Sequence, residues 1–379
     1  MKIVVYGAGA VGSFFGGFLA KAGHRVSLLG RSWHLDVVRR KGLRITGSMG
    51  EFLIRDLKLY TNVKAIYNSP IQMGNHGALA PPLQSKNFDL VLLTVKPKDT
   101  EICAKEIAEL LKSPIPPLVK GVKKRALVKG EKKEMTPILT IQNGLGNLEI
   151  LSKYILPSQL LAGRLITSVS IEPGKITVGA TADDFLIGEV YPLSLPLTKG
   201  ENKRGLFPLK RVVIPPKKRG LKRAKEIARV LTDAGIKTRE VKDIQKYLWS
   251  KMVFNTSLNG LASLLEVTYG DLLKSAESKE LIRKTVGEIY NVAEKKGIAL
   301  DPPSVRSHIR LLFDKLIPTF NSHIPSMLRA IREGKRTDID FLNGAISRFG
   351  MELDVKTPIN DMITHLIKAK EGLRRRLNG

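Results

Sequence analysis

The sequence is poor in cysteine and lacks long hydrophobic runs. Cys103 is the single cysteine among 379 residues, so the chain can form neither an internal disulfide nor a cysteine-based metal cluster. Six scattered histidines add no pattern of metal ligands. No apolar stretch approaches the roughly 20 residues of a membrane-spanning helix, and the first residues resemble a strand rather than a signal peptide. We therefore expect a cytoplasmic protein with no metal site and no membrane partner.

Acidic residues are also scarce, since 35 Asp and Glu oppose 63 Lys and Arg, for a net charge of +28. The excess is concentrated in two stretches rich in Pro and Gly. Residues 112–133 hold eight Lys and Arg against one Glu, and residues 199–229 hold twelve against two. We interpret the two stretches, near 112–133 and 199–223, as solvated surface insertions. The alternative is a surface that binds RNA or another polyanion, but no aromatic stacking residues accompany the charge, so we expect no nucleic-acid partner.

The N-terminal sequence KIVVYGAGAVGSFFGG predicts a site for a dinucleotide. A buried strand of β-branched residues (2–6) precedes glycines at positions 7, 9 and 12, and a helical pattern follows until Gly23. This is the G-x-G-x-x-G motif in its strand–turn–helix context. The first glycine permits the turn, the second lets the backbone approach a pyrophosphate, and the third lets the helix pack closely. We expect the pyrophosphate to contact Gly7, Ala8, Gly9, Ala10, Val11 and Gly12.

The end of the second predicted strand, RVSLLGRS, indicates which dinucleotide binds. An NAD site has Asp or Glu at this position to bind the ribose hydroxyls. This chain has Arg31 instead, 19 residues after Gly12, and a guanidinium there can bind a 2′-phosphate through paired hydrogen bonds. The sequence therefore favours NADP(H). The alternative is that Arg31 is an ordinary exposed loop residue.

Further strands are predicted within 88–99 and 134–147, followed by Lys96 and Asn143. Ligands of open α/β sheets lie at the carboxyl ends of the strands, so both side chains should face cofactor or substrate. Residues 164–180 and 184–191 predict a hairpin that extends the sheet in antiparallel fashion. Residues 221–241 predict a helix, stopped by Gly235, and then a strand. We place a Rossmann-type domain at 1–241 and an all-helical domain at 242–379.

One helix of the second half carries an unusual polar stripe. Lys251, Asn255 and Asn259 are spaced four apart and share a helix face, among residues such as Trp249 and Leu258 that suggest burial. Polar groups in such surroundings are costly without a polar partner. A lysine in a partly buried site is a candidate general acid, whereas the alternative is a solvated face.

The sequence resembles the ketopantoate reductase (2-dehydropantoate 2-reductase) family over nearly the whole chain except the insertions. TVKPKD, IQNGLGN, WSKMVFNTSLNGLASLL and PSMLRAIREGKRTDIDFLNG carry the resemblance. It implies a Rossmann domain plus a helical domain with the active site between them, NADPH-dependent reduction of ketopantoate in coenzyme A biosynthesis, and a homodimer. It also implies roles for individual residues: catalysis by Lys251 and Asp338, substrate binding by Asn143, Asn255, Asn259 and Ser326, and cofactor binding by Arg31, Lys96 and Asn143.

The chain departs from the family pattern at two positions. Asp338 stands where the family usually has Glu, which withdraws the carboxylate by about one methylene, and Ala330 stands where Asp is common. Two rival functions remain open. One is another NADP-dependent 2-oxo acid or β-hydroxy acid reductase on the same scaffold, and the other is a polyanion-binding protein that has kept the fold.

Overall fold

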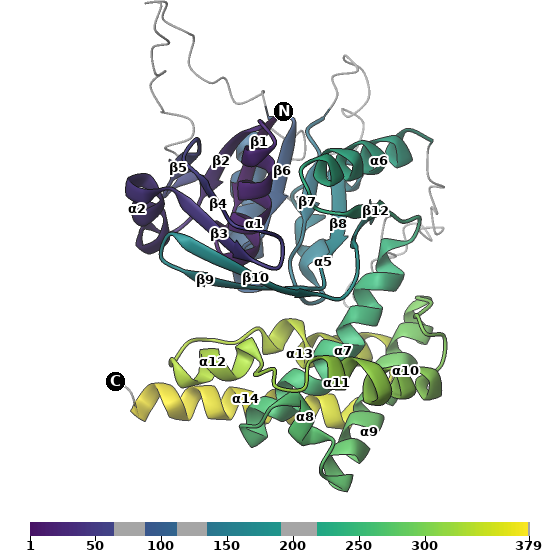
Figure 1. The fold of residues 1–379 in the computed structure, drawn as a ribbon. Coiled ribbons are helices and arrows are strands. Elements are labelled where there is room, and N and C mark those ends of the chain that lie inside the picture. The colour runs from purple at the N-terminus through teal and green to yellow at the C-terminus, as the bar shows by residue number, and fades with distance from the viewer. Residues whose placement is uncertain (64–87, 112–134, 191–217, 378–379) are drawn as a thin grey trace, which may run out of the picture. The chain divides into compact units, whose positions relative to one another are not determined.

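The computed structural model describes residues 1–63, 88–111, 135–190 and 218–377 (Figure 1). The chain forms two compact units, one of residues 1–142 and 148–244, the other of residues 143–147 and 245–379. The chain thus passes into the second unit between Ile244 and Gln245, and the short segment 143–147 also belongs to it. Of the two basic insertions, the first lies outside the described residues, as does the second up to residue 217.

Eight strands form the main sheet of the first unit, in the order β12-β11-β8-β7-β6-β1-β2-β5. Neighbouring strands are parallel except β11 and β8, which are antiparallel. The predicted α/β fold with a Rossmann-type sheet is confirmed. The strands are β1 (Lys2–Tyr6), β2 (Arg25–Leu29), β5 (Lys58–Tyr60), β6 (Leu90–Leu93), β7 (Ile138–Thr140), β8 (Leu160–Arg164), β11 (Phe185–Glu189) and β12 (Thr238–Glu240).

A second sheet of four strands, in the order β4-β3-β10-β9, lies on the other side of helix α1 (Figure 1). Two adjacent glycines allow α1 to fit between the sheets. A methyl carbon on Gly16 would lie 2.5 Å from Leu28 of the main sheet, and one on Gly17 would lie 2.4 Å from Ile45 of the second. The elements are α1 (Ala10–Lys21), β3 (Leu43–Gly47), β4 (Phe52–Ile54), β9 (Thr167–Glu172) and β10 (Lys175–Thr181).

The prediction for residues 164–191 was wrong about the sheet that residues 164–180 join, whereas residues 184–191 do extend the main sheet in antiparallel fashion. Strands β9 and β10 do form an antiparallel hairpin, but β10 pairs with β3 in the second sheet rather than extending the main one. Strand β11 joins the main sheet beside β8. The sequence pattern did not predict β8 as a strand. The remaining helices of this unit are α2 (Ser32–Lys41), α4 (Thr100–Leu110), α5 (Asn147–Leu151) and α6 (Lys218–Asp233).

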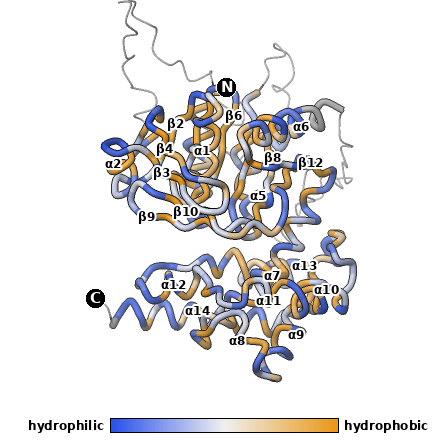
Figure 2. Tube along the Cα trace, in the orientation of Figure 1, coloured by the Kyte–Doolittle hydropathy of each residue, from blue (hydrophilic) through white to orange (hydrophobic). Residues whose placement is uncertain are grey.

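The second unit is helical, as predicted, with its longest helices α7, α9 and α14 packed around one apolar core. Figure 2 shows hydrophobic stretches in orange recurring through the elements of both units. Within the described ranges, every helix is too short or too polar to span a membrane. The principal helices are α7 (Ile244–Leu265), α8 (Tyr269–Leu272), α9 (Ala276–Lys296), α10 (Val305–Leu311), α12 (Ser326–Arg332), α13 (Asn343–Leu353) and α14 (Pro358–Leu377).

Candidate functional site

The first group of candidate residues lies at the carboxyl edge of the main sheet. Strands β6, β1 and β2 are adjacent and parallel, so the residues that follow them meet at one edge. Gly7 follows β1, Arg31 follows β2 and Lys96 follows β6. Arg31 and Lys96 are both exposed.

The three glycines of the motif have distinct geometries. Gly7 has a φ of +105°, a conformation that side chains disfavour. A methyl carbon at Gly12 would lie 2.1 Å from the carbonyl oxygen of Gly7, so only glycine permits this approach of helix and loop. At Gly9, by contrast, an added methyl carbon would meet no atom of the described residues within 4 Å. The space beside Gly9 is therefore open, as a backbone that receives a ligand requires.

The start of α1 offers backbone N–H groups at this open space. Helix α1 has no acidic residue in its first turn and no side chain that caps it, so neither competes for its partial positive charge. Thr94, which the sequence analysis did not single out, supports the loop because its hydroxyl donates to the carbonyl of Gly7 at 2.8 Å. The residues Gly7 to Gly12 and Arg31 thus suit a phosphorylated dinucleotide.

Buried His34 fixes α2 against α1. The ring nitrogen Nδ1 lies 3.1 Å from the backbone N of Gly174 and 3.3 Å from the carbonyl oxygen of Glu172, and Nε2 lies 3.1 Å from the hydroxyl of Ser13. Burial lowers the pKa of His34, although its hydrogen bond with the Glu172 backbone opposes this, so the neutral ring is favoured. Ser13 follows Gly12, and His34 lies three residues after Arg31. The contact of His34 with Ser13 therefore links the segments of Gly12 and Arg31, the two predicted phosphate-binding residues.

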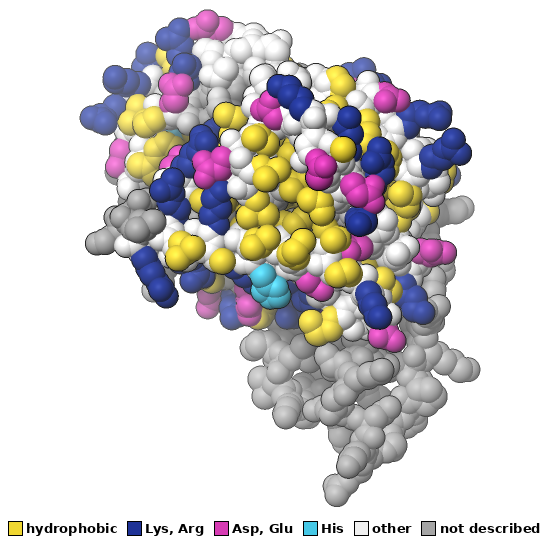
Figure 3. Space-filling model, turned by 90° about the horizontal axis from the view of Figure 1, so that it is seen from below, with side chains coloured by type: hydrophobic (Ala, Val, Ile, Leu, Met, Phe, Trp, Pro, Cys, Tyr) yellow, Lys and Arg dark blue, Asp and Glu magenta, His cyan; other side chains and the backbone are white. Residues whose placement is uncertain are grey.

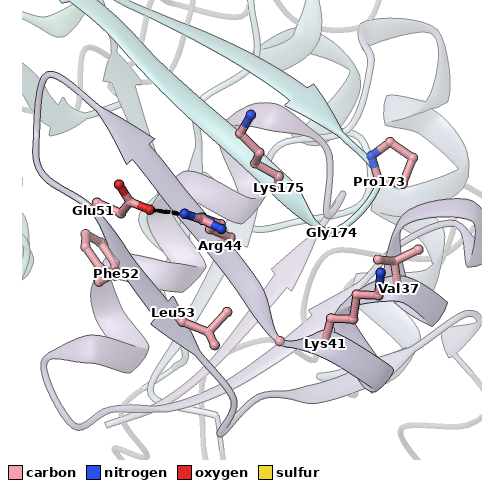
Figure 4. A pocket seen from close by; sticks show the side chains of 10 residues that line it. Val37, Lys41, Arg44, Glu51, Phe52, Leu53, Pro173, Gly174 and Lys175 are labelled. Atoms are coloured by element: carbon pink, nitrogen blue, oxygen red, sulfur yellow. Dashed lines mark hydrogen bonds and ion pairs between the residues drawn. The ribbon is translucent and has the colours of Figure 1, made fainter.

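A shallow hollow of about 520 Å³ lies near Gly174, at the C-terminal end of α2 and thus away from Arg31 (Figure 4). It is lined by apolar side chains such as Phe52 and Leu53 and by the cations Lys41 and Lys175. Arg44 projects into it but forms an ion pair with Glu51. None of these residues belongs to a motif of the sequence, and the hollow lies beside the second sheet rather than at the carboxyl edge of the main one.

The second group of candidates lies in the helical unit, on α7. Lys251, Asn255 and Asn259 are all partly exposed, whereas Met252 and Leu258 on other faces are buried. The predicted polar stripe therefore exists on the accessible side of α7. An ammonium and two amides are presented along about two turns of one rigid helix.

Asn143 lies directly against this stripe. Its side-chain oxygen accepts a hydrogen bond from the Lys251 ammonium at 2.5 Å. The loop that carries Asn143 has a fixed shape, since Gly144 has a φ of +90° and Asn147 donates its side-chain N–H to the carbonyl of Asn143 at 3.1 Å. Immediately before it, buried Gln142 donates to the carbonyl of Val95 and to the hydroxyl of Thr100. Gln142 belongs to the motif IQNGLGN, but the motif alone predicts no role for it.

Asp338 belongs to a segment that packs on the same loop. It directly precedes the short 3₁₀ helix Ile339–Phe341, and the carbonyl of Phe341 accepts from the N–H of Leu145 at 2.9 Å. A methyl carbon at Gly144 would lie 2.7 Å from Phe341. The structure therefore joins the segments of Lys251, Asn143 and Asp338.

Ser326 is linked to the stripe through other residues. It is the exposed first residue of α12. The segment before it, 321–325, lies beside α8, where Tyr269 donates its hydroxyl to the side-chain oxygen of Asn259. No sequence signal pointed to Tyr269. Among the residues described, no three His, Cys, Asp or Glu side chains gather as metal ligands would.

Comparison with protein families gives matches over both units. Residues 3–191 match the family described as ketopantoate reductase PanE/ApbA, and residues 243–371 match its C-terminal region. The chain is 32% identical to a 2-dehydropantoate 2-reductase of Aquifex aeolicus, over 98% of this chain and 97% of that one. It is 28% identical to the enzyme of the same name from Pyrococcus abyssi, over 98% and 99%.

Solved structures give the same picture of the fold. A PanE/ApbA family ketopantoate reductase from Ralstonia eutropha superposes with a TM-score of 0.72 at 23% identity, covering 99% of this chain and 100% of that one. A D-mandelate dehydrogenase determined with NADH and anilino(oxo)acetate also has a TM-score of 0.72, at 25% identity and 99% coverage of both chains. The fold is thus shared by a ketopantoate reductase and a D-mandelate dehydrogenase.

Proposed function

Because the chain belongs to the ketopantoate reductase family and is an oxidoreductase, we propose that it reduces 2-dehydropantoate to pantoate with NADPH, and that Lys251 is the general acid. The proposal depends on one observation: the ammonium nitrogen of Lys251, on the accessible face of α7, lies 2.5 Å from the side-chain oxygen of Asn143. In this role residues 1–241 form the NADP-binding domain and residues 242–379 the substrate and dimerisation domain.

The residues at the sheet edge would hold the cofactor. Gly7 to Gly12 and the N–H groups of α1 would contact the pyrophosphate, and Arg31 the 2′-phosphate. Lys96 and Asn143 would contact the remainder of the cofactor. When bound, the reduced nicotinamide supplies the hydride that reaches C2 of the substrate.

The residues of the helical unit would act on the substrate. Negative charge develops on the carbonyl oxygen as hydride adds to C2, and the Lys251 ammonium stabilises this charge and delivers the proton. Asn143 orients the ammonium through the observed hydrogen bond. Asn255 and Asn259 donate hydrogen bonds to polar substrate atoms, and Ser326 binds the carboxylate. Asp338, in place of the usual Glu, acts from the segment packed on the Asn143 loop.

The test is turnover of ketopantoate by wild type and by Lys251→Ala, followed through the absorbance of NADPH. We expect kcat to fall by about 10²-fold or more when the general acid is lost. Lys295→Ala, which removes an exposed lysine from α9 of the same unit, is the matched control and should leave kcat unchanged. Equal rates in wild type and Lys251→Ala would refute the assignment.

A second candidate function is reduction of a different 2-oxo acid, favoured by the likeness to the D-mandelate dehydrogenase. The same assay therefore includes pyruvate, 2-oxoisovalerate and the 2-oxo acid that corresponds to mandelate. Turnover confined to one of these would keep the mechanism and change the substrate. No turnover of any acid, together with nucleic-acid affinity that falls steeply with salt, would favour the polyanion-binding alternative.

A homodimer is also proposed, with contacts made by the helical unit. Figure 3 shows hydrophobic side chains, in yellow, gathered on one face of the molecule. On α14, Met362, Leu366 and Leu373 are 46%, 47% and 62% exposed and lie on one side of the helix. Light scattering should give the mass of two chains, and Leu366→Glu should reduce it to one. A wild-type mass of one chain would contradict the dimer.

A further inference from the structure

The hydroxyl of Tyr269 determines which atoms Asn259 can present. Tyr269 is 3% exposed, and its hydroxyl donates to the side-chain oxygen of Asn259. An asparagine amide has one oxygen that accepts and one nitrogen that donates. Because the oxygen is engaged inside the protein, the N–H groups are the atoms left for a ligand. Burial raises the pKa of Tyr269, so the hydroxyl keeps the proton that it donates.

Tyr269 is itself held on several sides. Its backbone N–H donates to the carbonyl of His323 at 3.2 Å, and the N–H of Gly270 donates to the carbonyl of Asn321 at 2.9 Å. The Tyr269 ring also contacts the rings of Phe254, at 5.5 Å between centroids, and of His323, at 5.0 Å. These contacts tie Tyr269 to residues 321–325, the segment that leads directly into Ser326.

The start of α8 has a second anchor that fixes the backbone of Tyr269. The hydroxyl of Thr268 accepts from the N–H of Asp271, and the Asp271 carboxylate accepts in return from the N–H of Thr268 at 3.1 Å. Gly270 also packs closely on Asn321, since a methyl carbon at position 270 would lie 1.8 Å from the side-chain oxygen of Asn321 and 3.0 Å from its carbonyl oxygen. Tyr269 therefore has little freedom to move away from Asn259.

We infer that Tyr269 is a positioning residue that keeps the Asn259 amide turned with its N–H groups toward the substrate. Through residues 321–325, Tyr269 also fixes the position of this amide relative to Ser326. The inference rests on the proposed function, in which Asn259 and Ser326 contact an anionic 2-oxo acid. The carboxylate and the C2 carbonyl of the acid present only oxygen acceptors to the donors of Asn259. Without the tyrosine hydroxyl, the amide is free to rotate and present its own oxygen, which repels a carboxylate or a carbonyl.

The test is Tyr269→Phe, which removes one oxygen and keeps the ring that packs on Phe254. We expect the KM for the 2-oxo acid to rise about tenfold, the effect of one lost hydrogen bond. The kcat and the KM for NADPH should stay within about twofold, because Lys251 and the sheet edge are untouched. A purely structural role would instead lower the midpoint of thermal unfolding and leave the substrate KM unchanged.

The matched control is Tyr290→Phe. The Tyr290 hydroxyl donates to the carbonyl of Pro302 at 2.5 Å and contacts His308, so this variant loses a tyrosine hydrogen bond elsewhere in the same unit. It should leave the KM for the 2-oxo acid unchanged. An equal rise in KM for both variants would overturn the inference.

A double-mutant cycle separates the inference from the proposed function. In an Asn259→Ala background, Tyr269→Phe should have no further effect on KM, because the group that it positions is gone. Additive effects would overturn the positioning role while leaving Asn259 in the site. If Asn259→Ala alone leaves KM unchanged, Asn259 does not contact the substrate and the inference is overturned although the reductase function stands. If no 2-oxo acid is turned over, the proposed function itself fails and the inference fails with it.

Discussion

The ammonium nitrogen of Lys251 lies 2.5 Å from the side-chain oxygen of Asn143, although 108 positions separate the two residues in the sequence. Asn143 follows strand β7 of the main sheet, yet the five-residue segment that it begins belongs to the helical unit. The N–H of Leu145 and the positive φ of Gly144 hold this segment against Phe341. The orientation of the proposed acid therefore depends on a residue from the other half of the sequence.

Asn143→Ala should consequently impair chemistry. Loss of a hydrogen bond to a charged group corresponds to a fall in kcat of about 10- to 10²-fold. Steady-state kinetics with ketopantoate will measure it, and Asn291→Ala, an exposed asparagine on α9, is the control. An unchanged kcat would show that the ammonium needs no orientation by Asn143.

The glycine motif gives a prediction that separates binding from folding. Gly9→Ala adds a methyl group in open space, so the midpoint of thermal unfolding should stay at the wild-type value. The same methyl group would obstruct the pyrophosphate, and the dissociation constant for NADPH should rise at least about tenfold. Fluorescence titration of NADPH measures the affinity.

Gly12→Ala is the counterpart. Its methyl group would lie 2.1 Å from the backbone oxygen of Gly7, and backbone cannot move aside cheaply. We expect the free energy of unfolding to fall by about 2 kcal/mol or more. If Gly9→Ala binds NADPH as tightly as wild type, the pyrophosphate does not pass over this loop.

The sequence predicted the features of the fold that depend on the spacing of residues close together in the chain. The β1–α1–β2 unit follows from a buried strand, three glycines and a helical period, and the stripe of Lys251, Asn255 and Asn259 follows from a spacing of four on a helix. The distinct roles of Gly7 and Gly12 follow from the same motif.

Pairings between distant segments could not be predicted in the same way. Strand β3 pairs with β10, about 130 residues later. The local sequence pattern of either strand does not predict which strand it pairs with. The contact of Tyr269 with Asn259 crosses the turn between α7 and α8, where helical spacing no longer applies. The spacing of Arg31 after the glycine motif likewise predicts its position but not its ligand.

Arg31→Asp should therefore weaken NADPH selectively. Reversing the charge removes the proposed contact with the 2′-phosphate, and the KM for NADPH should rise about 10- to 10²-fold while that for NADH changes little. Arg25→Asp, an exposed arginine at the other end of strand β2, is the control. Equal losses with NADPH and NADH would count against Arg31 as the 2′-phosphate ligand.

Buried His308 should make the stability of the helical unit depend on pH. It is 1% exposed, and burial lowers the pKa of His308 to about 4 although nearby Asp301 opposes this. The Tyr290 hydroxyl lies 2.9 Å from its Nδ1.

Because the pKa of His308 in the folded protein lies below its unfolded value of about 6.5, the unfolded chain binds the proton first as pH falls. The stabilisation by neutral His308 is therefore complete above about pH 6.5 and is lost on acidification toward pH 4. By about pH 4.5 the loss should reach about 2 kcal/mol. Urea unfolding across this range should show a steeper decline for wild type than for His308→Gln, which has no group to protonate there. His365→Gln, at an exposed position on α14, controls for removal of a histidine as such and should decline like wild type. If His308→Gln also follows the wild-type curve, then another group causes the acid sensitivity and His308 does not change its protonation on unfolding.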